Sequence, residues 1–361
     1  MKKIIFIAVV IIIAIVIGIF AIHGAEEKDD QTITVGLILN GNADDSSWSQ
    51  SHYEGMKKTS EELGVELIYK ESVLESDLEV VTDELVSDGC DIIICNSYGY
   101  GEYLDEVSDK YPDIYFFHAS GIENGDNVTT FFGRMYQIRY LSGIAAGMAT
   151  KTNEIGYVAA FDISEVNRGI NAFTLGVRSV NPEAEVIVTW TNSWTDDNAA
   201  QSATQRLIDN HNIDIITMHV DSISPLDVAE KNGIKSIGYN LDNSSLYPDS
   251  YLTAATWSWE NFYIPQISAC MQDKFTGKNY WDGVETGIVS LAPLSESADS
   301  AISQKIEEEK EKMSQGMFDV FYGPVYDTQG NIRVADGESM SDDAMLNSFD
   351  WYVEGVMIDE Q

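Results

Sequence analysis

The stretch that decides the fold is Ile33-Thr34-Val35-Gly36-Leu37-Ile38-Leu39, which is almost entirely apolar and rich in β-branched side chains. A strand with one face in water would alternate apolar and polar residues. A near-continuous apolar run instead indicates a strand that is buried on both faces. A polar loop and then a helical stretch follow it, so the local unit is strand, loop, helix, which is typical of an α/β fold.

The same unit recurs along the chain. Further strands are predicted at 65–69, 91–95, 114–118 and 128–132, and a helix over about 135–151. The pattern then restarts, with strands at 155–160, 185–190, 213–218, 235–239 and 251–256. Apolar strands separated by helices predict parallel sheets covered on both faces, here in two tandem lobes.

The charge balance excludes several classes of partner. The 361 residues include 59 Asp and Glu against 21 Lys and Arg, a formal net charge of −38. Such a surface repels phosphates, so we expect no nucleic-acid partner. With 44% apolar residues the chain can still bury substantial cores, which argues against global disorder.

The N-terminus predicts export from the cytoplasm. Two lysines precede residues 4–22, which carry no polar side chain and, at about 1.5 Å per residue, would span one hydrocarbon core. Acidic residues follow, so the body is expected outside the cytoplasm. Residues 1–31 are therefore read as a signal peptide or a membrane anchor with its spacer, and both alternatives stay open.

The motifs of common catalysts are missing from the sequence. There is no G-x-S-x-G elbow, no H-E-x-x-H zinc motif and no P-loop lysine motif, and we predict no enzyme, no cofactor and no metal site. Residues 327–331 resemble half a calcium loop, but a turn between two strands is the simpler interpretation. Cys90, Cys95 and Cys270 are expected to be buried and unpaired.

Ligands of parallel α/β sheets collect where the strands end. The residues after the predicted strands are aromatic rings, amides and carboxylates, with no lysine among them. They suit a flat, neutral or cationic ligand that offers hydrogen-bond donors. The candidate ligand-binding residues are Ser97, Tyr98, Glu165, Asp221, Asn240 and Asp242, together with the tryptophans considered below.

Several of these loops resemble the basic membrane protein family of PnrA-like substrate-binding proteins of ABC transporters. The resemblance begins at Asp45-Ser46-Ser47-Trp48-Ser49-Gln50 and continues in the segments 132–143, 165–176, 192–196, 323–325 and 350–356. It implies a type I periplasmic binding protein: two Rossmann-like lobes with parallel sheets joined by a hinge. The N-terminal lobe is then expected at 32–150 and 261–295, and the C-terminal lobe at 151–260 and 296–361.

The resemblance also implies the ligand. Family members bind purine nucleosides or bases between the lobes, and the rings that sandwich the base correspond to Trp48 and Trp194 here. Two departures favour a free base: Asn240 stands where the nucleoside-binding branch has a ribose-binding carboxylate, and Trp257-Ser258-Trp259 replaces its lysine. Trp257 and Trp259 themselves are expected in the hinge or core.

These arguments predict an extracytoplasmic receptor that captures an adenine-like purine base and delivers it to the subunits of an ABC permease. A purine nucleoside receptor, a ligand sensor and a sugar receptor remain alternatives, and a nucleoside hydrolase is disfavoured. Asp221 and Asp242 have a rival role as caps of the helices that follow them, and Glu165 has the same rival role at a first helical turn. Arg134 and Arg139 are expected to form structural ion pairs.

Overall fold

A computed structural model describes residues 32–359. The hydrophobic segment interpreted as a signal peptide or anchor lies outside the described residues. Among those described, no helix combines the length and the apolar character that crossing a bilayer requires.

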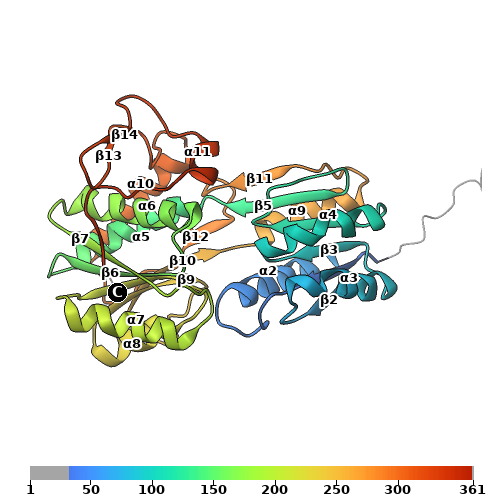
Figure 1. Ribbon diagram of the computed structural model, residues 1–361, viewed down its shortest axis with the longest axis horizontal. Coiled ribbons are helices and arrows are strands. Elements are labelled where there is room, and N and C mark those ends of the chain that lie inside the picture. Colours follow the sequence, from blue (N-terminus) through green and yellow to red (C-terminus); the bar gives the residue numbers. More distant parts are fainter. Residues whose placement is uncertain (1–31, 360–361) are drawn as a thin grey trace, which may run out of the picture. The chain divides into compact units, whose positions relative to one another are not determined.

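The first sheet is built from the apolar strands predicted in the first part of the chain. In the described part it has six strands, and every neighbouring pair is parallel. Figure 1 shows helices of the same lobe around it. In spatial order its strands are β11 (Asn279–Asp282), β5 (Val128–Gly133), β4 (Tyr115–Ala119), β3 (Ile92–Cys95), β1 (Thr34–Ile38) and β2 (Glu66–Lys70). Its helices are α2 (Trp48–Leu63), η1 (Glu75–Asp77), α3 (Leu78–Ser87), η2 (Tyr98–Tyr100), α4 (Gly101–Lys110) and α9 (Glu260–Met271).

The second sheet has seven strands in the described part, parallel except for one edge strand, β12. In order they are β12 (Val289–Leu291), β10 (Tyr251–Trp257), β9 (Lys235–Asn240), β8 (Ile215–His219), β6 (Glu154–Ala159), β7 (Glu185–Trp190) and β15 (Val356–Ile358). The accompanying helices are α5 (Met135–Ala149), α6 (Ser164–Val180), α7 (Asp197–Asn210), α8 (Ser224–Asn232), α10 (Ser300–Ser314) and α11 (Asp342–Asn347). All ten strands predicted from the sequence are present, and the parallel α/β architecture is confirmed.

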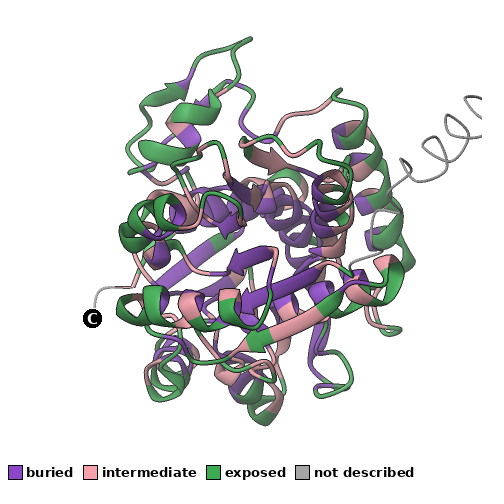
Figure 2. Cartoon of the chain, turned by 90° about the vertical axis from the view of Figure 1, so that its right-hand side faces the viewer, coloured by how far each residue is buried: buried purple, intermediate pink, exposed green. Residues whose placement is uncertain are grey.

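Burial follows the layers. Figure 2 shows buried residues concentrated on the central strands, while exposed residues mark the outer faces of the helices. The strand β3 is buried at every position, as its uninterrupted apolar run predicted. Cys90, Cys95 and Cys270 are buried and unpaired, as expected.

The lobes divide at points that differ from the expected boundaries. Helix α5 was expected in the first lobe, but it crosses α6 so closely that a Cβ on Gly143 would lie 2.1 Å from the carbonyl oxygen of Phe173. Strand β12, also expected in the first lobe, pairs with β10 of the second sheet. The crossings therefore lie near Arg134, between β10 and α9, and between β11 and β12.

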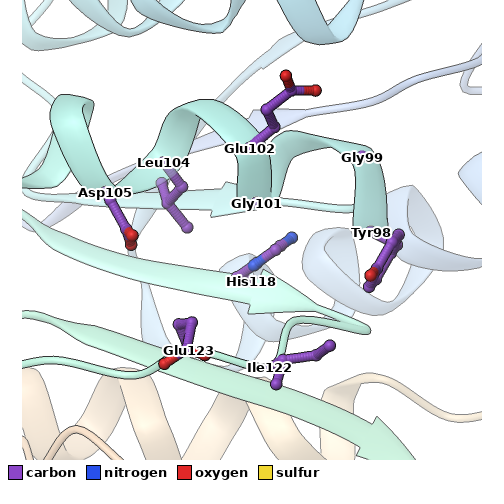
Figure 3. A pocket seen from close by; sticks show the side chains of 9 residues that line it. All are labelled: Tyr98, Gly99, Gly101, Glu102, Leu104, Asp105, His118, Ile122 and Glu123. Atoms are coloured by element: carbon purple, nitrogen blue, oxygen red, sulfur yellow. The ribbon is translucent and has the colours of Figure 1, made fainter. Parts of the chain in front are cut away.

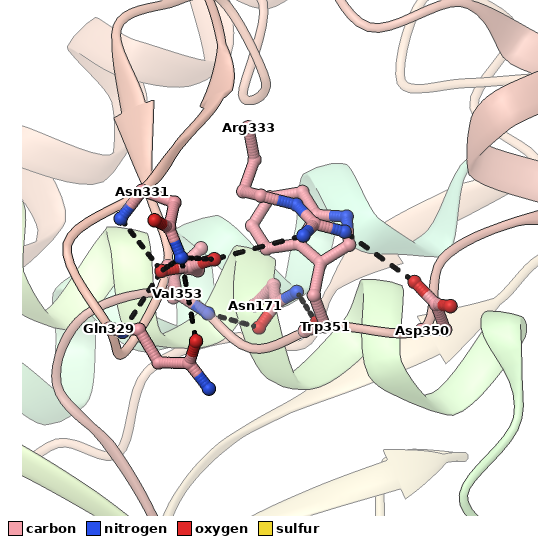
Figure 4. Close-up of polar contacts among 8 residues, drawn as sticks. Asn171, Gln329, Asn331, Arg333, Asp350, Trp351 and Val353 are labelled. Atoms are coloured by element: carbon pink, nitrogen blue, oxygen red, sulfur yellow. Dashed lines mark hydrogen bonds and ion pairs between the residues drawn. The ribbon is translucent and has the colours of Figure 1, made fainter.

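The C-terminal segment packs onto helix α6 through side-chain to backbone hydrogen bonds (Figure 4). The Asn171 amide donates to the carbonyl of Trp351 at 2.8 Å, and its oxygen accepts the N–H of Val353 at 2.9 Å. The segment includes the hairpin of β13 (Val325–Tyr326) and β14 (Ile332–Val334), with a turn at Asp327. That turn is the one predicted from the sequence: the Asp327 carboxylate accepts the backbone N–H groups of Gln329 and Asn331.

Candidate functional site

Loops at the carboxyl ends of both sheets enclose a small cavity of about 100 Å³. Parallel strands present their following loops at one edge of the sheet, which explains why residues far apart in sequence meet there. The cavity is lined from the first lobe by Asn40, Trp48, Asn96, Ser97, Tyr98, Ser120 and Phe132, and from the second by Glu165, Trp194, Asp221 and Tyr239.

Trp48 opens helix α2 and is held in place by its own lobe. Its indole N–H donates to the carbonyl oxygen of Asn96 at 2.8 Å, and its ring meets His52 and Trp259 edge-on at 4.4 and 5.4 Å. The loop before it is fixed by Asp45, whose carboxylate accepts three backbone N–H groups between 2.7 and 3.0 Å. The indole is thus a rigid wall of the cavity.

Trp194 lies in the loop after β7 and is half-buried. Its ring lies 5.9 Å from Phe161 and 6.1 Å from His219 in edge arrangements. Its carbonyl oxygen accepts the backbone N–H of Asp221 at 2.7 Å, which joins the two loops. The two tryptophans expected to face a ligand therefore line the same cavity, one from each lobe.

Asn240 is fully buried and uses its amide within the protein. Its Nδ2 donates to Asp221 Oδ1 and to Ser47 Oγ, both at 2.8 Å, and its Oδ1 accepts the indole N–H of Trp257 at 2.9 Å. It does not line the cavity. Asn240 therefore positions Asp221 and ties the second lobe to the first loop, a different role from the ligand contact we expected.

Asp221 and Glu165 are the two carboxyl groups on the cavity wall. Burial raises the pKa of Asp221 to about 8, with Asp45 and Glu165 adding to the shift and the Asn240 hydrogen bond opposing it. Burial also raises the pKa of Glu165, against the attraction of Arg168 and Arg139. Glu165 sits in the first turn of α6, where the helix N-terminus favours a carboxylate.

Two buried arginines, Arg139 and Arg168, lie near Glu165. Arg139 is fully buried; it donates to the carbonyl of Met218 at 2.8 Å and lies 4.1 Å over the Tyr239 ring. Its Nε and Nη2 find no hydrogen-bond partner among the described residues, so the expected ion pair is not formed. Arg134 does pair as expected, with Asp342 at 2.6 Å. Arg139 thus contacts the Tyr239 ring, which lines the cavity, but does not line the cavity itself.

Some of the remaining candidate residues line the cavity and others do not. Ser97 and Tyr98 line the cavity, and Tyr98 is 63% exposed at its rim. Asp242 is exposed, accepts the N–H of Ser244 at 3.0 Å and is absent from the wall. It lies in the turn between β9 and β10, where the described chain forms no helix for it to cap, so its rival role is not met either. Trp257 and Trp259 stack on each other at 4.4 Å in the core, as expected.

Tyr98 also borders a second, separate cavity of about 380 Å³ in the first lobe (Figure 3). Its other lining groups include His118 and the carboxylates of Glu102, Asp105 and Glu123. The buried His118 ring bonds the carbonyl oxygen of Ser97 at 2.8 Å. No cluster of three or more His, Cys, Asp or Glu able to hold a metal occurs in residues 32–359, here or elsewhere.

Chemically, the small cavity offers aromatic faces, two carboxyl groups and amide or hydroxyl groups, and no lysine or arginine on its wall. Sequence reasoning missed Phe132 and Tyr239, because aromatic residues at the ends of buried strands look like core. Their position as the next-to-last residues of β5 and β9, close to ligand loops, was the available signal. The wall suits an uncharged, planar ligand.

The family model described as "ABC transporter substrate-binding protein PnrA-like" matches residues 32–318. The chain belongs to this family. A purine-binding protein of Brucella abortus is 34% identical over 96% of this chain and 98% of its own length. A putative ABC transporter glucose-binding protein of Haloferax volcanii is 32% identical over 92% of this chain and 82% of its own.

Solved structures confirm the fold of this PnrA-like protein. An ABC transporter solute-binding protein of Conexibacter woesei superposes with a TM-score of 0.69 at 16% identity, covering 80% of this chain and 98% of that one. A transcriptional activator of Bacillus halodurans gives 0.70 at 24% identity, with 78% and 98% covered. The resemblance read from the sequence is confirmed. The family is one of extracytoplasmic solute-binding proteins, not of enzymes.

Proposed function

We propose that the protein captures a purine base, adenine-like, in the cavity between its lobes and delivers it to an ABC permease. The observation that carries this proposal is the pair Trp48 and Trp194, which line one small cavity from opposite lobes beside two carboxyl groups. The Brucella relative, whose name describes a purine-binding protein, supports the same ligand class. The N-terminal segment would export the protein, as a cleaved signal or as a tether to the membrane.

Two features favour a base over a nucleoside: the size of the cavity and the hydrogen bonds of the residues beside it. Sites for drug-sized ligands occupy about 300–1,000 Å³, whereas this cavity measures about 100 Å³. The indole N–H of Trp257 donates to the amide oxygen of Asn240 at 2.9 Å. Asn240 takes the place of the ribose-binding carboxylate of the nucleoside-binding branch, and Trp257 begins the segment that replaces its lysine. Neither side chain lines the cavity, so neither is placed to hold a ribose hydroxyl.

Stacking alone does not account for useful affinity. Each ring contributes about 1–3 kcal/mol by analogy with base stacking on aromatic side chains, and association costs at least about 4 kcal/mol. Micromolar binding requires about −8.2 kcal/mol net. Hydrogen bonds from the base edge to Glu165, Asp221 or the loop amides must supply the difference, in a site that excludes water.

A sugar is the second candidate, because the Haloferax relative is named as a putative glucose-binding protein. Aromatic rings and carboxylates also suit the apolar faces and hydroxyl groups of a pyranose. A purine base and a sugar differ in size and in ring planarity, so binding measurements with each ligand distinguish the two candidates.

The test is a thermal-shift panel followed by calorimetry. It contains adenine, hypoxanthine, guanine, xanthine, their nucleosides, and glucose. A ligand at about 100 times its Kd adds about 2.7 kcal/mol of stability, so we expect a clear shift with adenine and little with nucleosides or glucose. A shift with nucleosides alone would refute the choice of a base, and one with glucose alone the choice of a purine. Incubation with adenosine should release no free base, since release would indicate a hydrolase.

A further inference from the structure

Asp221 occupies a place on the cavity wall where a negative charge has little support. Its Oδ1 accepts one hydrogen bond, from the neutral amide of Asn240 at 2.8 Å. Among residues 32–359, no lysine, arginine or histidine forms an ion pair with it. Because a carboxylate that loses water without gaining a cation is costly, this half-buried side chain favours its protonated form.

The neighbouring charges act in the same direction. Asp45, from the loop before α2, and Glu165, at the start of α6, are carboxyl groups and oppose ionisation of Asp221. The buried cations Arg139 and Arg168 act on Glu165 instead. The free protein therefore holds the pKa of Asp221 at about 8, well above the ordinary value of 3.8.

The other titratable groups around Asp221 are neutral. Burial and the two arginines hold the pKa of His219, in β8, well below its usual value, so the ring carries no charge near neutral pH. Burial raises the pKa of Tyr239, in β9, well above its usual value, so its phenol stays protonated. Neither group supplies a positive charge to Asp221.

We propose that Asp221 recognises the base as a neutral carboxyl group, donating its O–H to a ring nitrogen and accepting from the amino group beside that nitrogen. Asn240 holds the carboxyl oxygen that remains an acceptor, which leaves the other oxygen as the donor. The complementary ligand edge pairs an unprotonated ring nitrogen with an exocyclic amine, as in adenine. This inference rests on the proposed function and names the edge that the site selects.

The consequence is a binding constant that depends on pH through one side chain. The neutral fraction of a group with a pKa of about 8 falls from about nine-tenths at pH 7 to about one-tenth at pH 9. Adenine itself stays uncharged over this interval. The affinity for adenine should therefore fall about tenfold between pH 7 and pH 9.

The experiment is calorimetric titration of adenine at pH 6, 7, 8 and 9 into the wild type and three variants. Asp221→Asn keeps a donor and an acceptor without an ionisable proton, so it should bind less than tenfold more weakly at pH 7 and lose the pH dependence. Asp221→Ala should bind at least about thirtyfold more weakly, since both hydrogen bonds are lost. Asp249→Asn, at an exposed loop position of the same lobe, is the control and should follow the wild type.

Two results would overturn the inference while leaving the proposed function intact. One is adenine binding to the wild type that stays constant or strengthens from pH 7 to pH 9. The other is an Asp221→Asn variant, folded by circular dichroism, that loses adenine as completely as Asp221→Ala, because the negative charge would then be required. A wild type that binds no purine base at any pH would refute both proposals together.

Discussion

At the scale of single residues, the sequence predicted which residues line the cavity better than it predicted the contacts that these residues make. Six of the eight candidate side chains line the cavity, because residues that follow parallel strands meet at one edge. Asn240 escaped this rule: its partners, Ser47 and Trp257, lie on another loop and in a neighbouring strand, and only the folded chain brings them together. The rigid support of each tryptophan was equally invisible in the sequence.

The ring of Trp194 gives the first residue-scale prediction. Trp194→Ala should weaken adenine binding by about 1–3 kcal/mol, or roughly five- to 150-fold, because one stacking face is lost. Trp194→Phe keeps an aromatic face and should lose less. Calorimetry measures both. Trp281, which lies under Arg134 and away from the cavity, provides the control Trp281→Phe. An Ala variant with wild-type affinity would remove Trp194 from the site.

Trp48→Ala should affect the stability of the fold as well as ligand binding. Its ring also packs against His52 and Trp259, so the variant should lose both affinity and thermal stability. Trp194 contacts fewer buried rings, and its variant should lose affinity with little change in Tm. Equal losses of Tm in the two variants would contradict this difference.

Asp221 also predicts how stability depends on pH. Its pKa is about 8 in the fold and near 3.8 when unfolded. Below pH 4 both states hold the proton; between pH 4 and pH 8 only the folded state does, so rising pH favours unfolding. Asp221→Asn removes this dependence, and its Tm should therefore rise relative to the wild type from pH 4 to pH 8. At pH 8 the gain should be at least about 1.4 kcal/mol, the equivalent of one pKa unit.

The check is a series of unfolding curves for both proteins across that interval without ligand. Asp249→Asn again serves as the exposed control and should track the wild type. A Tm difference between Asp221→Asn and the wild type that stays constant from pH 4 to pH 8 would show that the folded and unfolded pKa values are alike.

At the scale of elements, the predicted strands were accurate because a strand buried on both faces carries an uninterrupted apolar signal. β1, β3 and β8 are buried along their whole length. The short strands β11, β12 and β15 were missed, because three or four half-exposed residues give no periodicity. The division of the lobes near Arg134 depends on the close α5–α6 crossing, which a pattern of strands and helices does not reveal.

The C-terminal segment gives the prediction at this scale. Asn171→Ala removes the partner of the Trp351 carbonyl and of the Val353 N–H, both buried against α6. Leaving such groups unpaired should lower the free energy of unfolding by about 2–4 kcal/mol, measured by chemical denaturation. Asn347→Ala, an exposed amide bonded to Asp343, is the matched control and should change it by less than about 0.5 kcal/mol. Equal effects would mean that the two hydrogen bonds of Asn171 add no more stability than an exposed amide does.

At the scale of the whole molecule, the net charge of the chain and the electrostatics of the ligand cavity are separate features. The net charge of −38 comes from residues spread over the sequence, whereas the cavity wall carries two carboxyl groups with raised pKa values and no lysine or arginine. Surface repulsion destabilises the folded state as a whole, and salt screens it. The composition indicated an acidic, solvated surface, but it could not indicate that the binding site is electrostatically distinct from that surface.

This separation predicts opposite responses to salt. The Debye length falls from about 10 Å at 0.1 M to about 3 Å at 1 M, so the Tm should rise by several degrees over that range. Affinity for an uncharged base should change less than about threefold, since no ion pair with the ligand is formed. Calorimetric unfolding and adenine titration in sodium chloride measure the two responses, and choline chloride at equal ionic strength distinguishes screening from binding of sodium. If affinity instead fell steeply with salt while Tm rose, the ligand would be a cation held by ionised Glu165 and Asp221, because only such an ion pair is weakened by the same screening that stabilises the fold.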